Sequence, residues 1–409
     1  MKDIESSKKE SPLLGLTGMG GGVGGFSFLS GASATPFSIF AWGSNSWGQL
    51  GINQTENSKS SPTQVGTDTD WSIGMTSHAG YWSFLLRNDG TMWGTGRGVN
   101  GSSGMGFGDG PETSSPTQLP GTYTSLVVSR SVASTRGDGS LWVWGENGYG
   151  ELGLNSTTNY SSPKQVGTDT TWGSSDSDLT KEGGSFRTLA GGRYYKMFLK
   201  TNGTLWACGR NSNDMNLGLN DQANRSSPTQ VGTDTTWKAI SGRGHTMSAL
   251  KTDGTVWAWG RNGYGQAGQN NEIWYSSPAQ IGTETTWAEI DSHDSRMGAI
   301  KTDGTLWMWG SNNRGSLGHN EPASNNKSSP KQVGTNTNWS TISVGAACFA
   351  TKTDGTAWAW GTNDEGVLGL NNGGTYETAR SSPTQIGTGT KWQRIHIGSS
   401  SIFGLQTVD

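Results

Sequence analysis

The chain has 409 residues, of which 31% are hydrophobic, 65 are glycine and 20 are tryptophan, and its net charge is −3 at neutral pH. This charge provides no global positive field of the kind that nonspecific nucleic-acid binding needs, so the composition argues against a nucleic-acid partner. The two cysteines, Cys208 and Cys348, give no disulfide signal and therefore no indication of the compartment.

The first 35 residues differ in composition from the rest of the chain. Met1–Glu10 is short and charged, whereas Leu13–Leu29 is apolar but contains seven glycines. Each glycine costs a helix about 1 kcal/mol relative to alanine, so this run is a poor membrane span and a weak export signal. We expect a glycine-rich N-terminal arm over residues 1–35, which would need a neighbouring subunit to order it. Its candidate attachment residues are Leu13, Leu14, Leu16, Met19, Val23, Phe26 and Phe28.

From residue 36 onward a sequence repeat of about fifty residues occurs seven times. It is best preserved as Lys251–Gly260, followed by Ser276–Thr283. A period near fifty, built from short strands and glycine turns, is typical of a β-propeller with one repeat per blade. The glycines at the position of Gly260 are Gly43, Gly96, Gly145, Gly209, Gly260, Gly310 and Gly361.

One repeat predicts four strands. Trp237–Ile240 begins the first strand, and Thr246–Lys251 and Thr255–Gly260 form the second and third around an Asp-Gly turn, which is typical of a two-residue hairpin. Pro278–Ile281 forms the fourth strand. We place this strand at the outer edge of the blade, because proline cannot donate a hydrogen bond to a neighbouring strand.

Tryptophan recurs at three positions of the repeat, and these positions hold 17 of the 20 tryptophans. Alternation along a strand places such residues between adjacent blades, so we predict that all 17 form the core. The first position holds Trp93, Trp142, Trp206, Trp257, Trp307 and Trp358; the second holds Trp42, Trp144, Trp259, Trp309 and Trp360, with Cys208 as a small core residue; the third holds Trp71, Trp172, Trp237, Trp287, Trp339 and Trp392.

The two ends of the repeat region complement each other. Trp392–Asp409 supplies only the first two strands of a repeat, and Pro36–Ile52 supplies the missing third strand and its loop. Pairing of these segments would close the ring and remove open sheet edges. The sequence therefore predicts an all-β fold, a seven-bladed β-propeller over residues 36–409 that is closed by pairing of its N- and C-terminal strands.

The repeat resembles the regulator of chromosome condensation repeat family. The resemblance rests on the repeat itself and on the pattern Trp-Gly-x-Asn-x-x-Gly-x-Leu-Gly in Trp42–Gly51 and its close relative in Trp144–Gly153. It implies a seven-bladed propeller closed by its two ends. Members of this family range from guanine-nucleotide exchange factors to bacterial proteins that inhibit β-lactamase, so the fold does not select the function. The uniform, tryptophan-rich form of the repeat is similar to prokaryotic and viral members.

The segment Ser11–Gly25 is similar to the openings of virion proteins from marine tailed phages. This resemblance implies a virion structural protein, in the tail or on the capsid surface, whose partners are other virion proteins and a host-cell surface protein or glycan. Two alternatives stay open. One is a secreted or surface-bound bacterial propeller that binds or inhibits a protein or glycan, with residues 1–34 as its export signal. The other is a guanine-nucleotide exchange factor.

We expect no catalysis, no cofactor and no metal. The five histidines lack metal-ligand spacing, and no Gly-x-Ser-x-Gly motif or P-loop occurs. The glycine pattern Gly20-x-Gly22-x-x-Gly25 matches a dinucleotide-binding motif, but no βαβ unit surrounds it.

Positions that vary between repeats, while their neighbours stay constant, are better candidates for recognition. They follow the third strand or precede the fourth, and they often hold Trp, Tyr or Arg, which anchor protein interfaces. The alternative is that these side chains merely cover neighbouring loops. The candidate binding surface consists of Trp47, Trp82, Tyr149, Tyr160, Arg225, Tyr264, Trp274, Tyr275, Arg314, Lys327 and Arg380.

A cation recurs two residues before each hairpin Asp or Asn. Such a ring could attract an anionic surface. We favour the other interpretation, in which each cation is neutralised beside its own turn. The ring consists of Arg87, Arg136, Lys200, Lys251, Lys301 and Lys352, with Thr407 at the seventh position.

Overall fold

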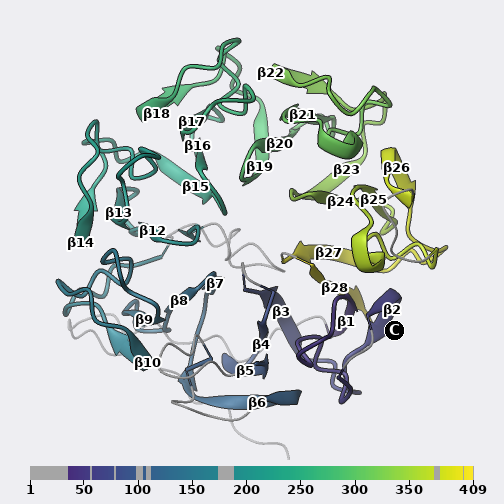
Figure 1. Cartoon of the computed structure of the whole chain (residues 1–409), viewed down its shortest axis with the longest axis horizontal. Helices are drawn as coiled ribbons and strands as arrows, with labels where there is room; N and C mark the ends of the chain where they lie inside the picture. Colours follow the sequence, from purple (N-terminus) through teal and green to yellow (C-terminus); the bar gives the residue numbers. More distant parts are fainter. Residues whose placement is uncertain are drawn as a thin grey trace, which may run out of the picture. The chain divides into compact units, whose positions relative to one another are not determined.

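The computed structural model describes residues 36–55, 58–77, 80–97, 105–106, 112–173, 188–372, 378–398 and 400–408. These residues form seven four-stranded antiparallel sheets that follow one another around a central axis (Figure 1). The first strand of each sheet lies innermost and the fourth outermost. The predicted seven-bladed propeller is therefore confirmed. Among the described residues, no helix has the length and apolar character needed to cross a bilayer.

We number the blades in chain order. Blade 1 contains β3 (Trp71–Thr76), β4 (Trp82–Arg87), β5 (Thr91–Gly96) and β6 (Thr113–Thr122); blade 2 contains β7 (Val127–Val128), β8 (Ser131–Thr135), β9 (Leu141–Gly145) and β10 (Tyr160–Gln165); blade 3 contains β11 (Leu189–Ala190), β12 (Tyr195–Leu199), β13 (Leu205–Gly209) and β14 (Arg225–Gln230).

The remaining blades follow the same order. Blade 4 contains β15 (Trp237–Ser241), β16 (Thr246–Lys251), β17 (Val256–Gly260) and β18 (Tyr275–Gln280); blade 5 contains β19 (Trp287–His293), β20 (Arg296–Lys301), β21 (Leu306–Gly310) and β22 (Lys327–Gln332); blade 6 contains β23 (Trp339–Ser343), β24 (Ala347–Lys352), β25 (Ala357–Gly361) and β26 (Arg380–Gln385). Blade 7 contains β27 (Trp392–Ile397), β28 (Ser401–Thr407), β1 (Phe37–Gly43) and β2 (Lys59–Gln64); two short 3-10 helices, η3 (Asn313–Gly315) and η4 (Asp364–Gly366), follow β21 and β25.

Blade 7 joins the two ends of the propeller. Strand β28 pairs with β1 over seven residues of each strand, from Phe37 opposite Thr407 to Gly43 opposite Ser401. The predicted closure is confirmed, but its register corrects one detail. Gln406 lies opposite Trp392, as Lys352 lies opposite Trp339 in blade 6. The seventh position of the cation ring is therefore Gln406 and not Thr407. Counting back two residues from Asp409 places it one residue too late.

The motif Thr-Asp-Gly-Thr-x-Trp recurs in the repeats because its side chains form hydrogen bonds with one another. In blade 4 the Asp253 carboxylate accepts hydrogen bonds from the backbone N–H (2.9 Å) and hydroxyl (2.7 Å) of Thr255, whose Oγ1 accepts one from Trp257 Nε1 at 3.0 Å. Gly254 has a φ of +80°, and a Cβ there would lie 2.1 Å from the carbonyl oxygen of Thr285. The turn therefore requires glycine. The same chain links Asp89, Thr91 and Trp93; Asp138, Ser140 and Trp142; Asn202, Thr204 and Trp206; Asp303, Thr305 and Trp307; and Asp354, Thr356 and Trp358.

The second tryptophan position joins adjacent blades. Its five indoles are fully buried. Trp259 Nε1 donates to the Asn216 carbonyl of the preceding blade at 2.8 Å, and Trp309 Nε1 donates to Gln266 at 3.0 Å. The six indoles of the third position are also buried, as predicted. The six of the first position, which lie two residues beyond the hairpin turn, are only half-buried, which corrects the expectation of a uniform core.

Blade 3 departs from this pattern in its interior. Cys208 occupies the second tryptophan position and is fully buried, as expected for a small core residue. Lys196 lies opposite it, and its Nζ donates to the hydroxyls of Ser129 and Ser131 at 2.7 Å. Burial lowers the pKa of Lys196 to about 8, and burial raises the pKa of nearby Glu151 to about 7. Lys196 therefore bonds to the preceding blade, as the indoles of the second tryptophan position do elsewhere.

Candidate interaction surface

The propeller has two rims of different construction. The loop rim carries the connections between the first and second strands and between the third and fourth strands of each blade. The hairpin rim carries the turns between the second and third strands and the segments that lead to the next blade. In blade 4, the pair Thr246–Gly260 lies at the loop rim and the pair Trp237–Lys251 at the hairpin rim.

Exposed aromatic and aliphatic side chains gather on the loop rim. Among the described residues, six large hydrophobic side chains are exposed, and all but Val408 lie on this rim. Tyr264 is 50% exposed and Trp274 is 40% exposed. Aromatic rings that remain exposed on a rigid scaffold are typical of protein-binding surfaces. The five are Tyr81, Tyr149, Tyr264, Ile273 and Trp274.

Arginines lie against aromatic rings of this rim. The Arg97 guanidinium carbon lies 4.2 Å from the centre of the Trp47 ring, and the Arg261 carbon lies 5.3 Å from that of Trp274. The Arg210 guanidinium carbon lies 5.4 Å from the centre of the Tyr149 ring. Such stacking holds flat, amphipathic side chains in place without removing them from solvent.

The charges of the loop rim are only partly compensated. Arg97 pairs with Glu112 at 3.6 Å, and Arg130 pairs with Glu146 at 3.2 Å. Within the part of the chain that the structure describes, no carboxylate lies within 4.0 Å of Arg193 or Arg210. The blade 2–3 part of the rim therefore combines exposed tyrosine with cations that have no counter-ion among the described residues.

A second polar cluster on this rim surrounds His245. Its Nδ1 lies 3.3 Å from a carboxylate oxygen of Asp214, and Arg261 contacts the other oxygen at 2.6 Å. Burial alone would raise the pKa of Asp214, but His245 and Arg261 hold it below its usual value. Asp214 is therefore a buried anion that holds two half-exposed side chains, of which Arg261 lies beside Trp274. Among the described residues no group of three His, Cys, Asp or Glu side chains could hold a metal ion.

Trp82 corrects the predicted binding surface. It is buried in the core of blades 1 and 2, together with Phe84 and Trp144. Trp82 is the first residue of β4, where the side chain points between blades, and the exposed aromatic is its neighbour Tyr81. The repeat position of Tyr81 holds Arg130 and Tyr194 in the next two blades. This variation between repeats could have identified the position as part of the exposed rim.

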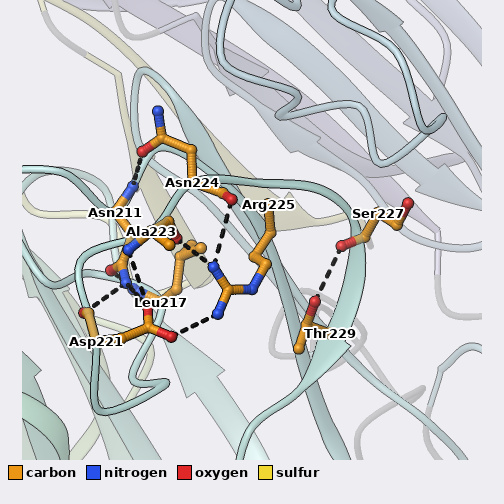
Figure 2. A network of polar contacts seen from close by, with 8 residues as sticks. All are labelled: Asn211, Leu217, Asp221, Ala223, Asn224, Arg225, Ser227 and Thr229. Atoms are coloured by element: carbon orange, nitrogen blue, oxygen red, sulfur yellow. Dashed lines mark hydrogen bonds and ion pairs between the residues drawn. The ribbon is translucent and has the colours of Figure 1, made fainter.

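Five predicted residues begin the fourth strands, and four of them bond within their own loops. Figure 2 shows the arrangement at Arg225, which pairs with Asp221 at 2.5 Å and donates to the Ala223 carbonyl at 2.8 Å. Asn211 donates to the Asp221 carbonyl and accepts from the backbone N–H of Leu217. A binding role for this set stays a prediction. The other members are Tyr160, Tyr275, Lys327 and Arg380, of which Tyr275 bonds to Asn271, Lys327 to Glu321 and Arg380 to the Thr378 carbonyl.

The other predicted residues divide between the loop rim and the arm. Trp47, Tyr149 and Trp274 each lie against one of the arginines described above, and Tyr264 is exposed on the same rim. Arg314 instead pairs with Asp364 of the next blade. The N-terminal arm lies outside the described residues. The predicted attachment residues there are Leu13, Leu14, Leu16, Met19, Val23, Phe26 and Phe28.

On the hairpin rim, four ring cations are neutralised, although not by the hairpin Asp. The carboxylate comes from the segment that leads into the same blade, because the hairpin Asp already binds its threonine. Each of these cations also lies over two indole rings. The pairs are Arg87 with Asp68 (2.5 Å), Lys200 with Asp169 (2.5 Å), Lys251 with Asp234, and Lys301 with Glu284 (2.7 Å).

Comparisons with known proteins agree with this architecture. The family model described as "Regulator of chromosome condensation (RCC1) repeat" matches residues 38–77, 138–177, 303–350 and 354–405, and a second model of this repeat matches residues 241–266. The solved structure of Prp20p from Saccharomyces cerevisiae superposes with a TM-score of 0.77 at 17% identity, over 92% of this chain and 93% of that one. Human WBSCR16 gives 0.74 at 18% identity, over 91% of this chain and 100% of that one.

The chain is also similar to parts of longer proteins. "Probable E3 ubiquitin-protein ligase HERC4" of Homo sapiens is 27% identical over 47% of this chain and 17% of its own length. "Ultraviolet-B receptor UVR8" of Arabidopsis thaliana is 26% identical over 58% of this chain and 51% of its own length. The chain thus spans about half, or less, of the length of these curated relatives. The repeat matches, the closed seven-bladed ring and its structural neighbours together show that the chain belongs to the family of RCC1 repeat proteins.

Proposed function

We propose that this protein is a non-enzymatic scaffold that binds a partner protein through its loop rim. The observation that carries this proposal is the gathering of Tyr81, Tyr149, Tyr264, Ile273 and Trp274 on one rim of a rigid ring. Aromatic residues and arginine supply most of the binding free energy in protein interfaces, where a few anchors each contribute about 2 kcal/mol or more. The RCC1 structural neighbour Prp20p is itself described by its binding to Gsp1p and histones.

We further propose that the complete protein is a virion component of a tailed phage. In this proposal the glycine-rich residues 1–35 attach the chain to neighbouring virion subunits, and the loop rim contacts a virion protein or the host-cell surface. The resemblance of Ser11–Gly25 to phage virion proteins supports the assignment. Because the arm precedes the propeller in the sequence and the propeller has its own core, attachment and recognition could act independently.

The virion assignment is tested by quantitative mass spectrometry of purified virions. We expect the chain at a fixed ratio to the major capsid protein, and we expect a variant without residues 1–35 to fold but not to be incorporated. Absence of the intact chain from virions would contradict the assignment. A mature chain that starts near Thr35 in the culture medium would instead support an exported bacterial protein.

Rim binding is tested by double substitution of Tyr264 and Trp274 with alanine. We expect affinity for the rim's partner, measured with purified protein after cross-linking has identified it, to fall at least about tenfold, as expected for loss of an interface anchor. The matched control is Val408→Ala, which removes the one exposed large hydrophobic side chain of the described residues that lies off this rim. Equal loss in the control would contradict the proposal.

A further inference from the structure

The ring cations of the hairpin rim form a repeated ion-pair site. In blade 4, Lys251 Nζ lies 4.6 Å from the centre of the Trp237 ring and 3.8 Å from that of Trp257. Asp234 pairs with the same Nζ. The lysine is therefore enclosed by two indole faces and one carboxylate. Blades 1, 3 and 5 repeat this arrangement with Asp68, Asp169 and Glu284 as the acids.

Blade 6 has the cation and both rings but lacks the acid. Lys352 Nζ lies 4.8 Å from the centre of the Trp339 ring and 4.3 Å from that of Trp358. The position of Asp234 is taken by Asn336, which is exposed. Across the described ranges no carboxylate lies within 4.0 Å of Lys352. Lys352 is buried, and this burial lowers its pKa.

A pocket of about 250 Å³ adjoins this incomplete site. It lies between the fourth strands β22 and β26 of blades 5 and 6. Its walls include Trp339 and Trp358, the same rings that enclose Lys352, together with the ring of Pro383. Asn336 also lines it, so the position of the missing carboxylate opens into the pocket. Another lining residue, Lys331, is already paired with Glu321.

We propose that this pocket binds a small organic carboxylate with an apolar body. The ligand carboxylate takes the place that Asp234 occupies in blade 4 and pairs with Lys352, while its body packs between Trp358 and Pro383. The propeller itself supplies the template, because four of its blades neutralise the equivalent cation with a carboxylate. A buried cation that gains such a partner recovers part of its desolvation cost.

Blade 7 provides an internal comparison. A pocket of about 380 Å³ lies between blades 6 and 7, lined by Trp392, Gly389 and Gln406. Gly389 stands at the position of the acid and Gln406 at that of the cation. This pocket has lost both charges, so it should not select a carboxylate. In blade 2 the acid position holds Tyr123, and the Arg136 guanidinium carbon lies 5.2 Å from the centre of its ring. The proposal therefore concerns the one site of blade 6, where Lys352 and a pocket occur together.

The test is isothermal titration of the full chain with benzoate, with benzamide as the uncharged probe of the same shape. We expect one benzoate site per chain. Benzamide should bind at least about tenfold more weakly than benzoate, because a charge-assisted pair contributes about 1.5–3 kcal/mol. Asn336→Asp supplies an internal carboxylate and should abolish benzoate binding, as should Lys352→Gln. Asn336→Ser leaves the position uncharged and should preserve it.

Two outcomes would overturn the proposal. One is equal binding of benzoate and benzamide. The other is undiminished benzoate binding by Asn336→Asp or Lys352→Gln. Far- and near-ultraviolet circular dichroism of each variant checks that the fold is intact. Because Asn336→Asp recreates the pair already present in blade 4, it is expected to fold, so loss of binding in this variant reports on the site and not on unfolding.

Discussion

On the hairpin rim the recurring polar side chains bind one another, whereas on the loop rim aromatic rings and arginines at non-repeating positions reach solvent. Trp257, Thr255 and Asp253 form a linear chain of hydrogen bonds, and Lys251 is held by Asp234. Tyr264 and Trp274 stay exposed in the same blade. Residues that recur in every repeat of this chain therefore meet structural requirements. Residues that vary between repeats, at positions whose neighbours are constant, form the surface available to partners.

The largest effect should separate blade-joining tryptophans from rim aromatics. Trp309→Ala removes a fully buried indole and its bond to Gln266, so we expect about 3–5 kcal/mol of lost unfolding free energy. Tyr264→Ala on the loop rim should cost less than about 0.5 kcal/mol. Urea denaturation followed by tryptophan fluorescence measures both. Similar losses in the two variants would remove the distinction between core and surface.

Two glycines of one blade sharpen the same comparison. Gly254→Ala on the hairpin rim should cost at least about 2 kcal/mol, because φ is +80° and the new Cβ would meet the Thr285 carbonyl. Gly263→Ala on the loop rim should change stability by less than about 0.5 kcal/mol, since no atom lies within 4 Å of its Cβ position. Thermal unfolding of the pair is the measurement, and a tolerated Gly254→Ala would contradict the account.

The pH dependence of stability tests the exceptional interior of blade 3. Burial raises the pKa of Glu151 from its ordinary 4.5 to about 7. Between these values the folded state keeps a proton that the unfolded state releases, so stability falls as pH rises. Glu151→Gln removes this titration, and glutamine already accepts the equivalent backbone bond at Gln49 and Gln266.

We therefore expect Glu151→Gln to be more stable than the parent above pH 7, by about 1–3 kcal/mol, and the difference to shrink toward pH 4.5. Urea titrations at pH 4.5, 6 and 8 measure it. A stability difference that does not vary with pH would show that Glu151 is not held in its protonated form by burial.

The smallest effect concerns the hairpin chain itself. Asp253→Ala removes the acceptor of two hydrogen bonds from Thr255 at an exposed turn, so we expect about 1 kcal/mol of lost stability. The control is Glu272→Ala, which removes an exposed carboxylate on the loop rim of the same blade and should leave stability nearly unchanged. Chemical denaturation distinguishes the two, and equal values would contradict a structural role for the repeated Asp.

The periodic part of this architecture could be predicted from sequence, because glycine turns, proline edges and tryptophan positions each act locally. The closing pairing of β28 with β1 followed from an incomplete repeat at each end. The error at Gln406 arose because the register of two distant strands depends on their pairing and not on local spacing. The direction of a single side chain was equally hidden: Trp82 points between blades while its neighbour Tyr81 points outward. The carboxylate of Asp234 reaches Lys251 across the blade, a contact that no sequence spacing revealed.

The most direct test of the central claim is site-specific photo-cross-linking in the assembled particle. A photoreactive phenylalanine in place of Tyr264 reports on the loop rim, and one in place of the exposed Thr302 reports on the hairpin rim. We predict a discrete cross-linked partner protein from position 264 and none from position 302. The same partner from both positions, or a partner from position 302 alone, would contradict the assignment of the loop rim as the binding surface.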